Sequence, residues 1–206
     1  MPGTSKQMKM IFVVLVLLGA TTIVGYHFLR AGDIQLASAQ RAFDAGRFDV
    51  AEEALMRATR YDPGHALAWY RLGITRKCMG NISGAADALT RAVQLHDSDV
   101  NWWFECAQVQ QWARRFDAAE HAWKRTLELL PPGDGRRREA QVNLARVIVF
   151  QGDVDRGVAV LREMVAANDD PDLRFDLAEL LSWVGRLEES AKQYQIGLQQ
   201  KSENQP

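Results

Sequence analysis

The chain has 206 residues, of which 47% are hydrophobic and 25% are charged, and its formal net charge is -1. A chain of this composition can bury a core, and it lacks the basic excess that is typical of nucleic-acid-binding proteins. Nucleic acid is therefore not an expected partner.

An apolar segment lies near the amino terminus. Residues 10–29 contain no Asp, Glu, Lys or Arg, and Lys9 and Arg30 bracket them. At about 1.5 Å per residue, a helix of this length crosses a hydrocarbon core of about 30 Å. We therefore expect a single transmembrane anchor at 10–29 behind a short polar tail at 1–9. A cleavable secretory signal is the alternative, because Lys6 and Lys9 form a small basic lead-in.

The charges that flank this segment do not decide its orientation. Lys6 and Lys9 precede it, whereas Arg30, Arg41 and Arg47 follow it within the range over which positive charges are counted. A short tail, one span and a folded domain behind it are typical of bacterial signal anchors. We expect a bacterial inner-membrane protein with its folded domain in the periplasm, and a cytosolic domain is the alternative.

Behind this segment, one pattern of residues recurs at intervals of 34 positions. Its centre is a small residue, which is Ala51, Ala85 and Ala119 in the first three copies. Two later copies carry Gly157 and Ser190 at the same place. Small residues are needed where two packed helices approach closely, because the backbones nearly touch there.

The copies also share signals for the ends of helices. Glycine favours the left-handed conformation that often ends a helix. It occurs between the two expected helices of four copies, as Gly46, Gly80, Gly152 and Gly185. The second copy also begins with Trp69, Leu72 and Gly73 in the spacing W-x-x-L-G. A period of 34 residues with these residues at these places resembles the tetratricopeptide repeat family.

The resemblance implies an all-α fold. We expect a right-handed tetratricopeptide-repeat superhelix of about five helix-turn-helix repeats at 32–200, preceded by the transmembrane helix and followed by a polar tail at 201–206. The repeats are expected at about 32–65, 66–99, 100–133, 138–170 and 171–200. Arg136, Arg137 and Arg138 open a helix after a Pro- and Gly-rich turn. We interpret this run as a solvated helix start, and contact with anionic lipid or an acidic partner is the alternative.

In the family, the first helix of each repeat lines a concave groove that binds peptides or partner domains. The residues of this chain at such places are predicted to bind the partner: Phe43, Tyr70, Ile74, Phe104, Gln108, Trp112, Arg146, Phe150, Phe175 and Trp183. The predicted groove is aromatic and only lightly charged. Apolar surfaces of this kind tend to mark partner sites. For any single ring, packing against the next repeat is the alternative.

Some members of the family hold the tails of cytosolic chaperones with a two-carboxylate clamp of lysine, asparagine and arginine. The corresponding places in the first two repeats of this chain include Gln40, Tyr70, Arg71 and Ile74. The clamp is therefore not assembled, and a chaperone-tail adaptor is not expected.

The sequence contains no pattern that indicates catalysis. The four histidines are scattered without metal-ligand spacing. Gly133 and Gly135 form a Gly-x-Gly without a preceding strand, so they do not indicate a phosphate-binding loop. Cys78 and Cys106 are expected to be buried thiols and not a disulfide. We expect a protein that is not an enzyme and that has no cofactor, metal or small-molecule substrate.

The segment from Leu177 to Tyr194 is similar to tetratricopeptide segments of bacterial exopolysaccharide synthesis and export proteins. We therefore expect a non-enzymatic scaffold, anchored in a membrane, that holds protein or peptide partners in a bacterial envelope complex. One alternative is a periplasmic assembly factor that holds apocytochrome or other client tails. Another is a cytosol-facing protein that resembles an import receptor.

Overall fold

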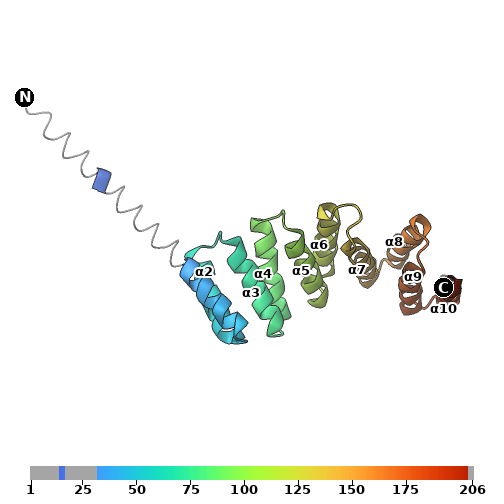
Figure 1. The fold of residues 1–206 in the computed structure, drawn as a ribbon, viewed down its shortest axis with the longest axis horizontal. Helices are drawn as coiled ribbons and strands as arrows, with labels where there is room; N and C mark the ends of the chain where they lie inside the picture. Colours follow the sequence, from blue (N-terminus) through green and yellow to red (C-terminus); the bar gives the residue numbers. More distant parts are fainter. Residues whose placement is uncertain (1–13, 17–31, 204–206) are drawn as a thin grey trace, which may run out of the picture. The chain divides into compact units, whose positions relative to one another are not determined.

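The computed structural model describes residues 14–16 and 32–203 (Figure 1). All regular secondary structure in these residues is helical. The chain divides into two compact units, which we call unit 1 (Met1–His96) and unit 2 (Asp97–Pro206). Except for residues 14–16, the predicted anchor at 10–29 lies outside the described residues. No helix within 14–16 and 32–203 has both the length and the apolar character needed to cross a bilayer.

Unit 1 consists of helix pairs joined by short turns. Residues 32–44 pair with α2 (Phe48–Tyr61), and α3 (Ala66–Cys78) pairs with α4 (Ile82–Leu95). Asn81 caps α4, because its side-chain oxygen accepts a hydrogen bond from the Gly84 N–H at 3.0 Å. Apolar side chains from all of these helices form one core, which includes Ala39, Ala54, Leu55, Leu72 and Ala88.

Unit 2 repeats the same arrangement along the chain (Figure 1). Its helices are α5 (Val100–Trp112), α6 (Phe116–Leu129), α7 (Arg136–Phe150), α8 (Val154–Ala167), α9 (Pro171–Trp183) and α10 (Leu187–Glu203). Each helix lies against the next one in sequence. Asp99 and Asp170 cap the first helices α5 and α9 by accepting hydrogen bonds from backbone N–H groups. The helix pairs in both units therefore match the repeat pattern of the sequence.

The small residues of the repeat lie where the helices of a pair approach most closely. Ala51, Ala85 and Ala119 are each 0% exposed. At Gly157 the approach is closer still, because an added Cβ would lie 2.8 Å from the backbone oxygen of Ala145. Glycine replaces alanine there because α7 leaves no room for a methyl group on this part of α8.

The two helices of each pair are joined by three residues, and the middle one has a positive φ. Between α3 and α4, the Gly80 N–H donates to the Lys77 oxygen and the Asn81 N–H donates to the Arg76 oxygen. These two bonds form a Schellman motif. In the turn between α5 and α6 the left-handed residue is Arg114, with φ 57°. The prediction of left-handed residues is confirmed at Gly46, Gly80, Gly152 and Gly185.

The basic run after α6 binds within unit 2 and is not simply solvated. Arg136 donates hydrogen bonds to Asp134, which hold the pKa of the Asp134 carboxyl at about 2. Arg137 Nη1 donates to the backbone oxygens of Leu127 and Leu130 at 3.0 and 2.9 Å. It thereby satisfies carbonyl groups at the end of α6 that lack helical partners. The helix α7 begins at Arg136, as expected, and both arginines also bind groups of their own unit.

Candidate partner-binding surfaces on the first helices

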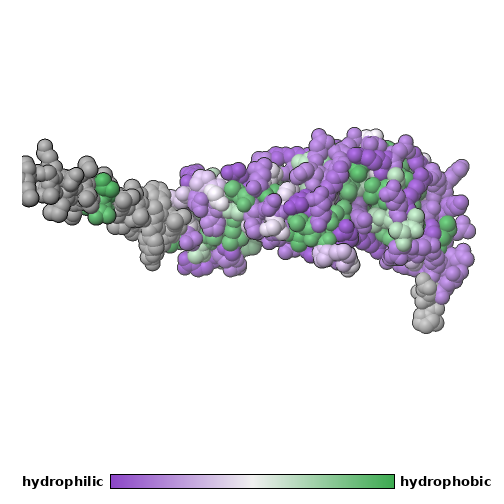
Figure 2. Space-filling view, turned by 90° about the horizontal axis from the view of Figure 1, so that it is seen from above, coloured by the Kyte–Doolittle hydropathy of each residue, from purple (hydrophilic) through white to green (hydrophobic). Residues whose placement is uncertain are grey.

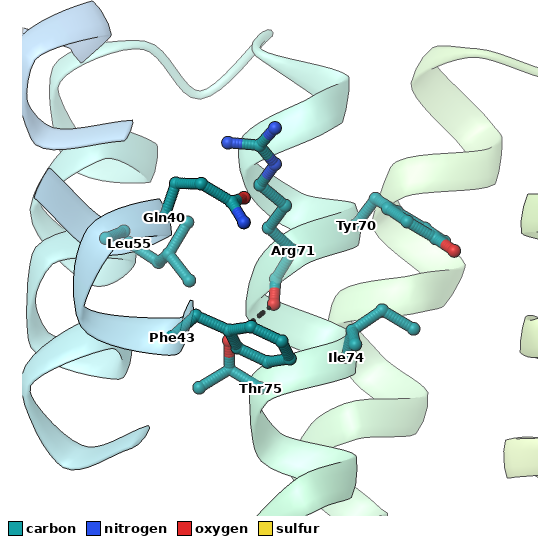
Figure 3. A pocket seen from close by; sticks show the side chains of 8 residues that line it. Gln40, Phe43, Leu55, Tyr70, Arg71, Ile74 and Thr75 are labelled. Carbon is teal, nitrogen blue, oxygen red and sulfur yellow. Dashed lines mark hydrogen bonds between the residues drawn. The ribbon is translucent and has the colours of Figure 1, made fainter. Parts of the chain in front are cut away.

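Three of the predicted groove residues line one pocket in unit 1. Phe43 comes from the helix at 32–44, and Tyr70 and Ile74 come from α3. The pocket has a volume of about 200 Å³. Sites for drug-sized ligands typically have about 300–1,000 Å³, so this pocket suits a single side chain better than a whole small molecule. The other residues that line it are Ala39, Gln40, Leu55, Arg71 and Thr75 (Figure 3).

The polar side chains that line the pocket differ in whether they have hydrogen-bond partners. In Figure 3 the Phe43 ring lies beside Thr75, whose hydroxyl donates to the backbone oxygen of Arg71 at 2.8 Å. Gln40 Nε2 donates to Asp44 Oδ1 at 2.7 Å. Within residues 14–16 and 32–203, the Arg71 guanidinium makes no hydrogen bond or ion pair. A half-buried guanidinium beside an apolar wall is suited to bind a carboxylate.

A row of three aromatic rings runs across successive repeats of unit 2. Phe116 begins α6, Phe150 ends α7 and Trp183 ends α9. The ring centroids of Phe116 and Phe150 are 5.5 Å apart, and those of Phe150 and Trp183 are 6.3 Å apart. The Arg114 guanidinium lies 5.7 Å from the Phe116 centroid, and that of Arg146 lies 5.2 Å from the Trp183 centroid. We call Phe116, Phe150 and Trp183 the aromatic row.

Three predicted binding residues are exposed at the same place in their repeats. Trp112, Phe150 and Trp183 each end the first helix, and they are 55%, 49% and 50% exposed. Stacking stabilises Phe150 and Trp183, by about 0.5–1.5 kcal/mol per pair beyond burial, while it leaves their outer faces in water. Figure 2 shows hydrophobic residues on the surface of each unit among hydrophilic ones. The rings at the ends of α5, α7 and α9 are therefore accessible to a partner.

Two other predicted groove residues pack within their own repeats. Phe104 of α5 meets the buried Trp123 of α6 edge to face, with centroids 5.0 Å apart. Phe175 of α9 stacks on Tyr194 of α10 at 5.9 Å and lies under the Lys201 ammonium at 5.1 Å. Both rings are half-buried. They follow the packing alternative and hold the two helices of a repeat together.

The first helices of unit 2 are also linked by charged and polar pairs. Arg146 Nη2 lies 2.7 Å from Glu179 Oε2, and Arg138 Nη2 lies 2.7 Å from Asp176 Oδ2. Burial alone lowers the pKa of Arg138, but the hydrogen bond to Asp176 and other nearby carboxylates raise it above its usual value. Predicted binding residue Gln108 donates to Glu139 at 3.4 Å. Arg146 and Gln108 thus already have partners in unit 2.

The residues that the structure describes hold no cluster that suits a metal ion. No group of three or more His, Cys, Asp or Glu residues within 14–16 and 32–203 could hold a metal ion. Cys106 is buried as expected, whereas Cys78, the last residue of α3, is exposed, and both are free thiols. The pocket in unit 1 and the aromatic row in unit 2 are the candidate partner-binding surfaces.

Comparison with known proteins identifies relatives of this fold. Residues 36–75 match the family model described as tetratricopeptide repeat. A curated relative, the transcription factor tau subunit sfc4 of Schizosaccharomyces pombe, is 22% identical over 156 residues. The match covers 73% of this chain and 16% of that relative, so the chain spans less than a fifth of its length.

Solved structures with similar folds include MamA, with a TM-score of 0.67 and 17% identity over 84% of this chain and 92% of that one. YrrB, described as a TPR protein with an unusual peptide-binding site, has a TM-score of 0.63 and 13% identity, over 80% and 84% of the chains. PilF of Pseudomonas aeruginosa has a TM-score of 0.54 and 15% identity, over 82% and 76%. The match at 36–75 and these folds together support the resemblance to tetratricopeptide-repeat proteins.

Proposed function

We propose that this protein is a non-enzymatic scaffold that binds segments of partner proteins and is fixed to a membrane by residues 10–29. The observation that carries the binding function is the pocket between the helix at 32–44 and α3. It combines apolar walls from Phe43, Leu55 and Ile74 with the Arg71 guanidinium, which makes no hydrogen bond or ion pair with the residues that the structure describes. The partner segment therefore carries an apolar side chain next to a carboxylate. YrrB, which shares the fold, is described as having a peptide-binding site.

Replacing Arg71 with glutamate tests the pocket. Hydrogen bonds to charged groups contribute about 1.5–3 kcal/mol, so this variant is expected to bind an acidic ligand about tenfold more weakly or worse. We expect dodecamer peptides selected from a random library against the full-length protein to pair an acidic residue with an apolar one. The same selection against the variant should yield basic peptides. Affinities are measured by fluorescence anisotropy.

Arg60→Glu is the matched control, because Arg60 is an exposed residue of α2 outside the pocket. It changes the net charge equally and should leave peptide affinity unchanged. Selected peptides without acidic residues would contradict the proposed pocket. So would peptides whose affinity falls equally in both variants, because a general charge effect would then explain the binding.

The proposed anchor rests on residues 10–29, which contain no Asp, Glu, Lys or Arg over about twenty positions. Binding a scaffold to a membrane raises its effective concentration near membrane partners. We place the repeats on the periplasmic side of a bacterial inner membrane. The similarity of Leu177–Tyr194 to exopolysaccharide synthesis and export proteins supports a role in an envelope complex of that kind.

Replacing Val16 and Leu18 with lysine is expected to release the protein from membranes. A lysine at the centre of a membrane helix costs about 2.5–3.5 kcal/mol, so two of them oppose insertion strongly. In a bacterial host, the unmodified chain should sediment with membranes and resist extraction by high salt and carbonate. The lysine variant should remain in the supernatant.

The control carries the same two lysines at Ile34 and Val50, which are 55% and 40% exposed in unit 1. It should sediment like the unmodified chain. A Val16 and Leu18 variant that stays in the membrane fraction would show that residues 10–29 are not the anchor. A purified protein whose intact mass lacks residues 10–29 would show a cleaved signal instead.

A further inference from the structure

The last helix presents an apolar face that its own unit buries only in part, where Tyr194 stacks on Phe175 of α9. Leu187, Ala191, Tyr194 and Leu198 follow one another at intervals of four, three and four residues, so they lie on one face of α10. Leu187 is 65% exposed, Tyr194 40% and Leu198 62%. We call these four residues the α10 stripe. Such a row of exposed apolar side chains on one helix is typical of an interaction surface.

In the preceding repeat, the corresponding face is covered. When α8 and α10 are aligned at their first residues, Ala191, Tyr194 and Leu198 correspond to Val158, Leu161 and Val165 of α8. These three residues are at most 9% exposed. The helix α9 packs on them with three leucines: Leu173, Leu177 and Leu180. In the part of unit 2 that the structure describes, no helix covers the α10 stripe in this way. The stripe therefore has the chemistry of a face built to pack on another helix.

We propose that the α10 stripe pairs with the α10 stripe of a second copy of this chain, the two helices lying antiparallel about a two-fold axis. The spacing of four, three and four reads the same in both directions. Antiparallel pairing therefore places Leu187 against Leu198 of the second copy and Ala191 against Tyr194 of the second copy. A small residue opposite a large ring lets the helices approach closely, and every contact occurs twice, as an isologous interface requires.

The polar residues beside the α10 stripe fit this arrangement. Glu188 and Gln195 border one side of the stripe, and the antiparallel register brings Glu188 next to Gln195 of the second copy. A glutamine amide can donate a hydrogen bond to a carboxylate, and no like charges meet. Lys201, on the other side, is held by Asp172 in its own chain at 2.9 Å.

The first helix of a second copy is a poorer fit for this face. The helix at 32–44 has as many residues as α9. At the places of Leu177 and Leu180 of α9, it carries Ser38 and Arg41. Stacking of its first helix on α10 would therefore set a hydroxyl and a charge against Tyr194 and Leu198. The copies pair tail to tail and do not extend as a chain of repeats.

Directed crosslinking tests the register. One full-length variant carries Leu187→Cys and the other Leu198→Cys, each with a different tag and with Cys78→Ser to remove the exposed native thiol. In the proposed pair, Leu187 of one copy faces Leu198 of the other copy. The two Leu187 residues are then separated along the helix axes by the length of 11 residues, or about 16 Å. We expect mild oxidation of the mixture to yield disulfide-linked mixed dimers at least about tenfold in excess of self-linked ones.

Self-linked Leu187→Cys dimers at equal yield would overturn the antiparallel pair, and so would the absence of mixed dimers. Analytical sedimentation of the full-length protein in a mild detergent, over a range of protein concentrations, gives a second test. We expect the unmodified chain to dimerise as its concentration rises and the Leu198→Lys variant to stay monomeric. The control Ile34→Lys, at a site in unit 1 that is 55% exposed, should dimerise like the unmodified chain. The proposal would be contradicted if the unmodified chain were monomeric at every protein concentration, or if the Leu198→Lys variant still dimerised.

Discussion

Replacing Trp123 with alanine is expected to lower the free energy of unfolding of unit 2 by about 3–5 kcal/mol, as for other fully buried tryptophans. Trp123 is 0% exposed and packs edge to face on Phe104 of α5. Its Nε1 donates to Gln111 Oε1 at 3.2 Å. The substitution leaves a cavity between α5 and α6 and removes that hydrogen bond. Urea unfolding followed by far-UV circular dichroism measures the loss.

Trp112→Ala is the matched control, because the same side chain is removed at a place that is 55% exposed. Surface substitutions usually change stability by no more than about 0.5 kcal/mol. A partner that contacts the end of α5 would still lose affinity in this variant, so binding and folding are separated. Equal destabilisation by the two substitutions would contradict the burial that distinguishes these tryptophans.

Replacing Ala119 with leucine is expected to destabilise unit 2 by about 1–3 kcal/mol through overpacking. Ala119 is 0% exposed at the close approach of α5 and α6, so the larger side chain must push the helices apart. The preceding residue, Ala118, is exposed on the same helix, which makes Ala118→Leu a control with the same change in volume. Melting temperatures followed by circular dichroism distinguish them. An Ala119→Leu protein that melts with the unmodified chain would mean that the repeat phase is misplaced.

The helix pairs could be predicted from the sequence because their signals are local. Small residues at Ala85 and Ala119 and a glycine at Gly80 each meet one requirement of a close pair of helices, and the same requirement recurs every 34 residues. Arg114 gave no such signal, since arginine rarely adopts a positive φ and nothing in its neighbours indicates one. Its position relative to Gly80, one repeat later, was the available clue.

The candidate site was only partly predictable. The resemblance to tetratricopeptide repeats placed Phe43, Tyr70 and Ile74 on the groove side of first helices, and the structure brings them to one pocket. The spacing of residues along a helix could not separate Phe104, which packs on Trp123, from Trp112, which is exposed. Spacing gives the direction of a side chain from its helix axis but not the distance to the neighbouring helix.

The ion pairs between repeats were missed for a related reason. Arg146 and Glu179 are 33 residues apart, close to one repeat, and Arg138 and Asp176 are 38 apart. Opposite charges one period apart on first helices were a signal that each repeat considered alone does not show. Arg71 was judged only as a member of a clamp that the sequence lacks, and its place beside an apolar pocket depended on the packing of two repeats.

The pairs Arg138–Asp176 and Arg146–Glu179 have a mechanical consequence for unit 2. They tie α7 to α9 across the surface, whereas the leucines of α9 attach it to α8 from within. Partly exposed ion pairs weaken as salt is added, but apolar contacts do not. The two ion pairs between α7 and α9 therefore weaken as ionic strength rises, while the apolar packing of α9 on α8 is retained. The contact between α7 and α9 thus depends on ionic strength, whereas the apolar contact between α8 and α9 does not.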